Sequence, residues 1–345
     1  MNAPHPMRPV SPQPGANAAY SIHIGDCLAS LRDMPDASVH CCVTSPPYFG
    51  LRAYLPGDHA SKALEVGTED TPDAFVARLV EVFREVRRVL RDDGTLWLNL
   101  GDSYAANRSY QVPSTKGGVK HSPGQGAGGK ASAVPDGLKP KDLIGIPWRV
   151  AFALQADGWW LRQDIIWSKL NPMPESVRDR CTKAHEYVFL LSKGPRYYFD
   201  AEAIKEPASD NPVSAARRNR ADFCTVGTKA IQGTGFGQSG KGSNSDHKGE
   251  TRNRRSVWTV TTKPFKGAHF ATFPPDLIEP CILAGCPPGG TVLDPFGGSG
   301  TTAGVAVKHG RRAVLCELNP DYAALVPDRV RQIAGDTPDM LAGFA

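Results

Sequence analysis

The chain of 345 residues is 40% hydrophobic and 22% charged, with a formal net charge of +5, which suits one large α/β domain with a smaller module, or two modest domains. No apolar run approaches the roughly 18 residues that cross a bilayer, so no membrane partner is expected. The eight cysteines include no C-x-x-C pair and predict reduced, mostly buried thiols, with neither disulfides nor a bound metal.

The first half of the chain alternates short strands with helices. Residues 1–19 are rich in proline and lack the apolar segment of a signal peptide, so we expect a disordered leader in a cytoplasmic protein. Thr71 followed by Pro72 is a favourable helix start, and apolar residues at helical spacing continue to Gly94, where we expect the helix to end. The predicted elements are strands at 20–25, 38–43 and 95–100 and helices at 27–34 and 72–93.

Two long polar segments, 105–141 and 201–257, interrupt this rhythm in the rest of the chain. An insertion as long as 105–141 without periodicity is either functional or disordered. Strands that alternate with helices predict a mostly parallel, doubly wound sheet, which binds ligands at the carboxyl ends of its strands. The further predicted elements are helices at 145–156, 276–285 and 300–309 and strands at 161–168, 185–192, 291–293 and 312–316.

Positive charge is concentrated in the same two polar segments. Residues 107–141 hold six Lys or Arg and one acid, and residues 201–257 hold ten and six, so together they carry +9 and the rest of the chain −4. Basic, glycine-rich segments are what contact with phosphates requires. Any single segment of this kind is more often a solvated loop, but the distribution favours a nucleic-acid partner.

A glycine-rich turn follows the strand predicted at 291–293. From Asp294 to Thr302 the sequence is DPFGGSGTT, and its glycines allow a tight turn and the close approach of a ligand. Glu317 ends the next strand, 23 residues after Asp294, where a carboxylate accepts hydrogen bonds from ribose hydroxyls. The turn departs from the G-x-G-x-x-G pattern that binds a pyrophosphate. It therefore favours a nucleoside cofactor without phosphate, S-adenosylmethionine, over an ordinary connection between strand and helix.

A second constellation, Ser45-Pro46-Pro47-Tyr48, follows the strand predicted at 38–43. Consecutive prolines fix φ and remove two amide donors, so the carbonyls around them become rigid acceptors. The Ser45 hydroxyl and the Pro46 carbonyl suit the two N–H donors of a base amino group, and Tyr48 offers a flat face to an extruded base. A Pro-Pro turn with a surface tyrosine is the commoner meaning of this dipeptide. Only the pairing with the glycine-rich turn favours the catalytic interpretation.

In their order along the chain, these motifs resemble those of the β-class amino-methyltransferases of DNA, in which the catalytic tetrapeptide precedes the cofactor motif. The resemblance covers residues from about 20 to 330 outside the two polar segments. It implies the class I methyltransferase fold, an α/β, Rossmann-like, doubly wound and mostly parallel sheet with an inserted target-recognition segment. The matching motifs are Gly25-Asp26, Ser45 to Tyr48, Ile166 to Pro172 followed by His185-Glu186, His269 to Pro274, Asp294 to Gly300, and Glu317 with Asn319-Pro320.

The resemblance also implies a role for each set of side chains. The catalytic residues would be Ser45, Pro46, Pro47 and Tyr48. The cofactor S-adenosyl-L-methionine would be bound by Asp26, Cys27, His269, Phe273, Asp294, Phe296, Gly298, Ser299, Gly300, Thr301, Thr302, Glu317 and Asn319. Double-stranded DNA would be bound by Lys169, Arg217, Arg218, Arg220, Arg252, Arg254 and Arg255. No metal is needed.

The expected organisation places target recognition in the second polar segment, and a nucleoid-associated protein follows from its DNA partner. A homodimer and a cognate restriction endonuclease are left open as further partners. The expected segments are a leader at 1–19, a catalytic half at 20–200 with a flexible insertion at 105–141, a target-recognition segment at 201–257, a cofactor-binding half at 258–335 and a tail at 336–345.

Serine in the first tetrapeptide position resembles the cytosine-N4 members of the family, whereas Asp or Asn is typical of the adenine-N6 members. We therefore expect a site-specific DNA methyltransferase that flips a cytosine and methylates its exocyclic N4. Adenine N6 is the first alternative, and an RNA or protein substrate is the second. Cytosine C5 methylation would need a Pro-Cys nucleophile, but Pro280-Cys281 lies on a predicted helix before the cofactor turn, in the wrong order. A catalytically silent DNA-binding protein would usually have lost Tyr48 or the glycines.

Overall fold

The structure is a computed structural model, which describes residues 19–50, 54–55, 58–105, 138–208, 251–262 and 273–335. Residues 204–254 form a second compact unit, distinct from the larger unit of residues 1–203 and 255–345. The central sheet belongs to the larger unit. The segment boundaries expected from the sequence stay predictions.

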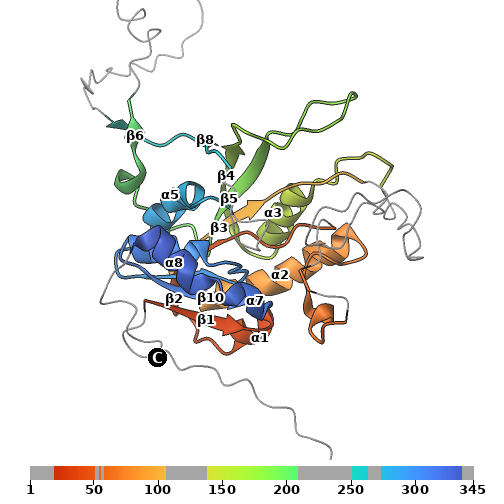
Figure 1. Cartoon of the computed structure of the whole chain (residues 1–345). Helices are drawn as coiled ribbons and strands as arrows, with labels where there is room; N and C mark the ends of the chain where they lie inside the picture. Colours follow the sequence, from red (N-terminus) through yellow and green to blue (C-terminus); the bar gives the residue numbers. More distant parts are fainter. Residues whose placement is uncertain are drawn as a thin grey trace, which may run out of the picture. The chain divides into compact units, whose positions relative to one another are not determined.

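An eight-stranded sheet forms the centre of the larger unit (Figure 1). Among the strands described, β5 runs antiparallel to β3 and β4, while every other neighbouring pair in this sheet is parallel. The prediction of a mostly parallel sheet is confirmed. In spatial order the strands are β1 (Tyr20–Ile24), β10 (Arg312–Glu317), β9 (Thr291–Asp294), β2 (Val39–Thr44), β3 (Leu90–Leu100), β5 (His185–Ser192), β4 (Trp160–Ser168) and β8 (Val257–Thr259).

The direction in which the chain adds strands reverses between β2 and β9. These strands are parallel neighbours, with Cys42 opposite Leu293. From β2 the chain crosses through α2 (Pro72–Val89) to β3 on one side, and from β9 it crosses through α6 (Thr301–Lys308) to β10 on the other. The carboxyl ends of β2 and β9 therefore border a topological switch point, where doubly wound sheets bind ligands. The tetrapeptide leaves one of these ends and the glycine-rich turn leaves the other.

Helices pack on both faces of the sheet. Alternate side chains of a strand point to opposite faces, and on β3 Leu96 and Leu98 join the core shared with α1, α2 and α3. Thr95 and Trp97 face the other way, toward α5, where a Cβ on Gly285 would lie 2.4 Å from Trp97 Nε1. The remaining helices are α1 (Cys27–Arg32), α3 (Ile146–Ala156), α5 (Pro275–Gly285), α7 (Pro320–Ala323) and α8 (Val326–Ala334), with a 3-10 turn at Lys62–Leu64.

Helix α2 begins as its sequence predicts. The Thr71 hydroxyl accepts a hydrogen bond from the backbone N–H of Ala74 at 3.1 Å, and Pro72 occupies the first turn. Phe75 and Phe83, on one stripe of the helix, have no exposed surface. Burying such a side chain contributes roughly 1.5–3 kcal/mol relative to exposure, so packing against the sheet stabilises this helix.

The predicted end of this helix at Gly94 is wrong. Helix α2 ends at Val89, and β3 begins at once with Leu90, whose ψ of 141° is extended. Gly94 lies inside β3, where a Cβ would be only 2.9 Å from the carbonyl oxygen of Arg91 and the register with β2 shifts. Glycine in this strand marks a close backbone approach, which the sequence pattern does not distinguish from a helix cap.

The cysteines that the structure describes form no disulfide bonds. Seven of the eight cysteines lie in the described ranges, and all seven are free thiols, six of them buried. No helix in those ranges is long and apolar enough to cross a membrane.

Candidate active site

A cavity of about 840 Å³, counted to its open mouth, lies at the carboxyl ends of β1, β2, β9 and β10. It therefore occupies the switch point of the sheet, where ligands bind in doubly wound folds. The tetrapeptide and the glycine-rich turn meet in its wall. Of the residues predicted for catalysis or cofactor binding, it is lined by Asp26, Cys27, Ser45, Pro47, Phe273, Asp294, Phe296, Gly298, Ser299, Thr301 and Glu317.

The glycine-rich turn depends on left-handed backbone at two positions. Gly298 has a φ of 52° and Gly300 a φ of 89°, which residues with a side chain rarely adopt. At Gly300 a Cβ would also lie 2.7 Å from a methyl carbon of Val326. The N–H of Gly297 donates to the carbonyl of Cys316 at 2.8 Å, which holds the turn against the end of β10.

Asp294 connects the turn with the tetrapeptide. Its carboxylate is 2% exposed and accepts hydrogen bonds of 2.6 Å from the hydroxyls of Thr44 and Thr302, as well as one of 3.1 Å from the N–H of Phe296. Burial raises the pKa of Asp294 to about 6, while these donors oppose the rise. Because Thr44 directly precedes the tetrapeptide, Asp294 fixes the ends of β2 and β9 relative to each other.

Glu317 lines the pocket with a carboxylate that already accepts backbone donors. The N–H groups of Gly298 and Asn319 each donate to it at 2.8 Å. Burial raises the pKa of Glu317 to about 7. Each carboxylate oxygen can accept more than one hydrogen bond, so acceptor capacity remains for a ligand.

The hydroxyl of Ser299 is a buried polar group that lacks a hydrogen-bond partner in the described part of the chain. Ser299 is 1% exposed and lines the pocket. A buried hydroxyl without a partner is destabilising by about 1–3 kcal/mol, which indicates that a ligand completes this site.

These residues fit S-adenosyl-L-methionine. The Glu317 carboxylate would accept from the ribose hydroxyls, and the Ser299 hydroxyl would pair with a polar group of the methionine part. Phe273 and Phe296 supply apolar walls. Cys27 also lines the pocket, and burial raises its pKa to about 12, so its thiol stays protonated and neutral.

The side chain of Tyr48 is fixed by contacts of its ring and of its hydroxyl. Its ring packs on Gly101, where a Cβ would lie 2.4 Å from Cε2. Its hydroxyl donates to the Glu186 carboxylate at 2.6 Å and lies 3.3 Å from Oδ1 of Asn99. Burial raises the pKa of Tyr48 well above its usual range, and the negative charge of Glu186 adds to this effect. Tyr48 therefore carries a neutral hydroxyl and a fixed ring plane.

Lys169 is engaged in the same cluster. Its ammonium forms an ion pair with the second oxygen of Glu186, and both side chains are largely buried, at 19% and 13% exposure. The ammonium also lies 4.4 Å from the centre of the Trp167 ring, a favourable cation–π distance. In the structure Lys169 neutralises Glu186, and both of its partners come from the protein.

Some predicted residues support the pocket from outside its lining. Gly300 is the N-cap of α6 and Thr302 lies in its first turn. Asn319 is the N-cap of α7, and its side-chain amide donates to the carbonyl of Tyr54 at 3.2 Å. Pro46 is buried. Tyr48 is also absent from the lining. His269 lies outside the described residues. The cofactor assignments as a set stay predictions.

The sequence reasoning missed one wall of the pocket, around the 3-10 turn that follows β2. The Glu65 carboxylate, 6% exposed, accepts from the N–H of Tyr54 and pairs with Lys62. This wall had no local signal, since it lies in an irregular segment without a strand or helix pattern. The lining residues that the motifs did not indicate include Tyr54, Leu64, Glu65, Val66, Leu318 and Tyr322.

The arginines predicted to bind DNA are only partly visible. Arg217, Arg218 and Arg220 lie outside the described residues. In the smaller unit, β6 (Glu206–Pro207) and β7 (Thr251–Arg252) form a two-stranded sheet in which Arg252 pairs with Glu206 at 2.8 Å. Arg254 and Arg255 also have interactions within the protein, so the roles of these arginines in DNA binding stay predictions.

Comparison with known proteins decides the family. A sequence model of the N6/N4 family, described as DNA methylase, matches residues 39–327. The chain belongs to this family. The Type II methyltransferase M.XycI of Xanthomonas campestris pv. cyanopsidis is 45% identical over 94% of this chain and 92% of its own length. M.Cfr9I of Citrobacter freundii is 46% identical over 89% and 86%, and M.SmaI of Serratia marcescens is 45% identical over 90% of each.

Solved structures agree on the fold. The PvuII DNA methyltransferase (cytosine-N4-specific) is 18% identical, covers 95% of this chain and 94% of its own and has a TM-score of 0.57. TTHA0409 of Thermus thermophilus, described as a DNA modification methylase and complexed with S-adenosyl-L-methionine, is 23% identical, covers 91% and 94% and has a TM-score of 0.52. The predicted Rossmann-like methyltransferase fold is confirmed.

Membership in the DNA methylase family confirms the resemblance that the motifs carried. The protein is a DNA methyltransferase of the N6/N4 type. Its family membership therefore decides in favour of DNA among the DNA, RNA and protein substrates considered from the sequence. S-adenosyl-L-methionine, predicted from the sequence, suits both this activity and the pocket.

Proposed function

We propose that this methyltransferase transfers the methyl group of S-adenosyl-L-methionine to the exocyclic N4 of cytosine in duplex DNA. The observation that carries the choice of base is Ser45, which occupies the first tetrapeptide position and lines the pocket. A hydroxyl accepts an amine proton more weakly than a carboxylate does, and serine in this position is typical of the cytosine-N4 members of the family.

In this proposal the residues of the tetrapeptide orient the amino group. The target base leaves the DNA double helix, which costs about a few kcal/mol of free energy for unpairing and unstacking. It then stacks on the fixed ring of Tyr48. The Ser45 hydroxyl and the Pro46 carbonyl accept hydrogen bonds from the two amine N–H groups and turn the nitrogen lone pair toward the pocket. S-adenosyl-L-methionine would supply an electrophilic methyl group from the pocket: the N–CH3 bond would form as the S–CH3 bond breaks, the thioether S-adenosyl-L-homocysteine would leave, and one amine proton would pass to solvent. Most of the rate enhancement then comes from alignment and from fixed dipoles.

Target recognition belongs, in the same proposal, to residues 201–257. This segment holds ten Lys or Arg against six acids, and arginines suit both phosphate contact and guanine edges. A homodimer and a cognate restriction endonuclease remain further predictions. Type II relatives are consistent with a restriction-modification context.

Mass spectrometry of nucleosides tests the choice of base. Unmethylated genomic DNA is incubated with the protein and S-adenosyl-L-methionine carrying an isotopically labelled methyl group, then digested completely. We expect the label in N4-methylcytosine. Label in N6-methyladenine would overturn the choice of cytosine while leaving the DNA amino-methyltransferase activity in place. The absence of label from DNA nucleosides would overturn the proposed activity itself.

A pair of variants makes this experiment specific to the site. Ser45→Ala removes the proposed amine acceptor, and Tyr48→Ala removes the stacking face. We expect both variants to lose most of the label while still binding S-adenosyl-L-methionine. A Tyr48→Ala protein with the full methylation rate would contradict the stacking role.

A further inference from the structure

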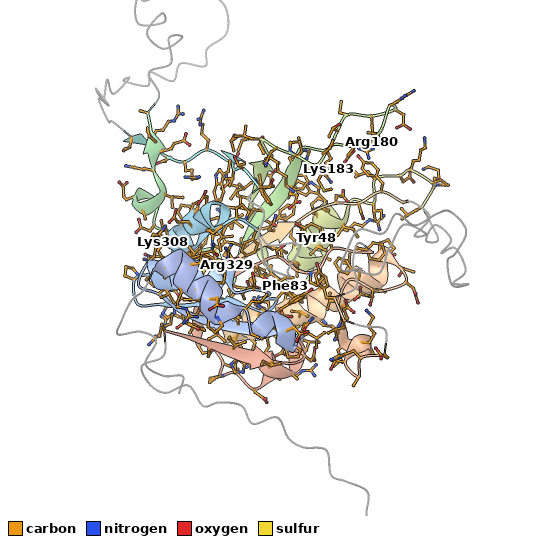
Figure 2. All side chains as sticks on the ribbon, in the orientation of Figure 1. Tyr48, Phe83, Arg180, Lys183, Lys308 and Arg329 are labelled. Atoms are coloured by element: carbon orange, nitrogen blue, oxygen red, sulfur yellow. The ribbon has the colours of Figure 1, made fainter. Side chains whose placement is uncertain are left out.

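Lys183 carries a buried ammonium that interacts electrostatically with Glu186, the hydrogen-bond partner of Tyr48. Its Nζ has no hydrogen-bond partner in the described ranges. Lys183 lies in the β4–β5 connection, which also carries Arg180 (Figure 2). The backbone bond from Lys169 N to Ala184 O, at 2.8 Å, pairs the two ends of this connection directly beyond the strands.

The position of Lys183 is at the edge of the sheet from which the tetrapeptide leaves. Strand β5 is antiparallel to β3, and its first residues lie opposite the last residue of β3, with Tyr187 facing Leu100. Because β2 and β3 are parallel, the start of β5 lies at the carboxyl edge of both. Lys183 thus adjoins the site at which the proposed base would be received.

The protein offers carboxylates near Lys183, but each is already used. The carboxylates of Asp102, Glu186 and Glu175 raise the pKa of Lys183, while the ammonium of Lys169 lowers it. The Asp102 carboxylate accepts from the backbone N–H of Ser103 at 2.9 Å and from those of Gly145 and Ile146, at the start of α3, at 3.0 Å each. Glu186 accepts from Tyr48 and pairs with Lys169, and Glu175 pairs with Arg180.

An ammonium that is buried without a hydrogen-bond partner is unfavourable in a folded chain. Burial lowers the pKa of Lys183, and the nearby carboxylates oppose this effect. A side chain placed in this way at the edge of a binding site is suited to a ligand acceptor, as Ser299 is in the cofactor pocket.

We propose that Lys183 binds the extruded target nucleotide, with its ammonium donating to an oxygen acceptor, either the O2 carbonyl of the base or an adjoining phosphate. The carbonyl partner rests on the proposed cytosine function, because adenine has no exocyclic oxygen. The phosphate partner requires only that the substrate is DNA. Lys183 takes the role that the sequence suggested for Lys169, whose ammonium is held by Glu186 and Trp167.

The test compares Lys183→Met, which keeps the length of the side chain and removes the charge, with Lys183→Arg, which keeps the charge. Lys308→Met is the matched control, because Lys308 lies on α6 and pairs with Glu279 on α5. Each full-length variant is measured for thermal unfolding, S-adenosyl-L-methionine binding, labelled methyl transfer into DNA and DNA affinity at several salt concentrations.

We expect the melting temperature of Lys183→Met to be at least that of the parent protein and its affinity for S-adenosyl-L-methionine to be unchanged. Its rate of methyl transfer should be at least about tenfold lower. Lys183→Arg should recover part of the rate, and Lys308→Met should resemble the parent. A phosphate partner lowers the slope of log affinity against log salt by about one. If the partner is the base carbonyl, Lys183→Met keeps the slope of the parent protein, and its rate of methyl transfer is lower even when the protein is saturated with DNA.

Two outcomes would overturn the proposal. Unchanged methylation by Lys183→Met would show that the ammonium does not bind the nucleotide. A melting temperature several degrees below that of the parent would show that Lys183 has a structural partner. Because labelled methyl groups are counted whichever base receives them, these results are independent of whether the product is N4-methylcytosine.

Discussion

The hydroxyl of Thr44 donates a hydrogen bond of 2.6 Å to the carboxylate of Asp294, across 250 positions of the sequence. Thr44 is the last residue of β2 and Asp294 the last residue of β9. The bond therefore joins the tetrapeptide that is proposed to be catalytic to the glycine-rich turn that is proposed to bind the cofactor. The hydroxyl of Thr302, in the first turn of α6, donates a second hydrogen bond of 2.6 Å to the same carboxylate. Residues of β2, β9 and α6 therefore meet at one buried carboxylate.

Loss of the Thr44 hydroxyl should weaken both the fold and the site. In Thr44→Val the carboxylate of Asp294 stays buried with one donor fewer, which lowers the free energy of unfolding by about 1–3 kcal/mol. Methyl transfer should fall as well, because the two strand ends lose their fixed spacing. Urea denaturation and initial rates measure the two effects. Thr44→Ser, which keeps the hydroxyl, should stay close to the parent protein; equal behaviour of both variants would contradict this role.

The raised pKa of Glu317 predicts a pH dependence of stability. Its pKa is about 7 in the folded chain against an ordinary value of 4.5, so between these values the folded state binds a proton that the unfolded state has released. The free energy of unfolding should therefore fall as pH rises through this window, by up to about 3 kcal/mol from this group. Glu317→Gln should show a shallower fall in urea denaturation across the same range. An identical slope in the variant would refute the assignment.

Gly101 should be intolerant of a side chain because of Tyr48. The added methyl of Gly101→Ala would lie 2.4 Å from Cε2 of the tyrosine ring, so the ring must move from the plane that would stack a base. We expect at least a tenfold loss of methyl transfer, or about 1.4 kcal/mol, with cofactor binding retained. Gly194→Ala is the control, since its Cβ would meet nothing closer than 4.0 Å; equal rates in the two variants would count against the fixed ring.

Tyr48 and Glu186 should behave as one functional unit. Tyr48→Phe and Glu186→Gln each alter the 2.6 Å hydrogen bond that fixes the ring, so each should lower the rate of methyl transfer. The double variant should be little worse than the more impaired single variant, with a coupling of about 0.5–3 kcal/mol. Initial rates of all four proteins form the cycle, and strictly additive losses would show that the contact does not act in catalysis.

Ser299 should bind the cofactor without stabilising the free protein. Its hydroxyl has no hydrogen-bond partner in the described ranges, so Ser299→Ala should leave the melting temperature unchanged or slightly raised. The dissociation constant of S-adenosyl-L-methionine should rise by about five- to tenfold, equivalent to roughly 1 kcal/mol. Calorimetric titration measures this change. Undiminished cofactor affinity would remove Ser299 from the binding site.

The local parts of the fold could be predicted because their signals lie within a few residues. Thr71 and Pro72 define the start of α2, and apolar runs between turn residues located β2 and β9 within two residues of their ends. The prediction failed at Gly94, where a helix cap and a close approach within a strand have the same sequence signature. It also missed Glu65, since the wall that it forms belongs to an irregular segment.

By itself the sequence determined the alternation of strands and helices, the order of the motifs and the family, because turn chemistry and hydrophobic periodicity are local properties. Only the tertiary structure decided which side chains meet. Asp294 accepts a hydrogen bond from Thr44 because β9 lies beside β2 in the sheet. Glu186 contacts both Tyr48 and Lys169 because β5 lies antiparallel between β3 and β4. Such pairings depend on strand order and register, which arise from the packing of the whole sheet.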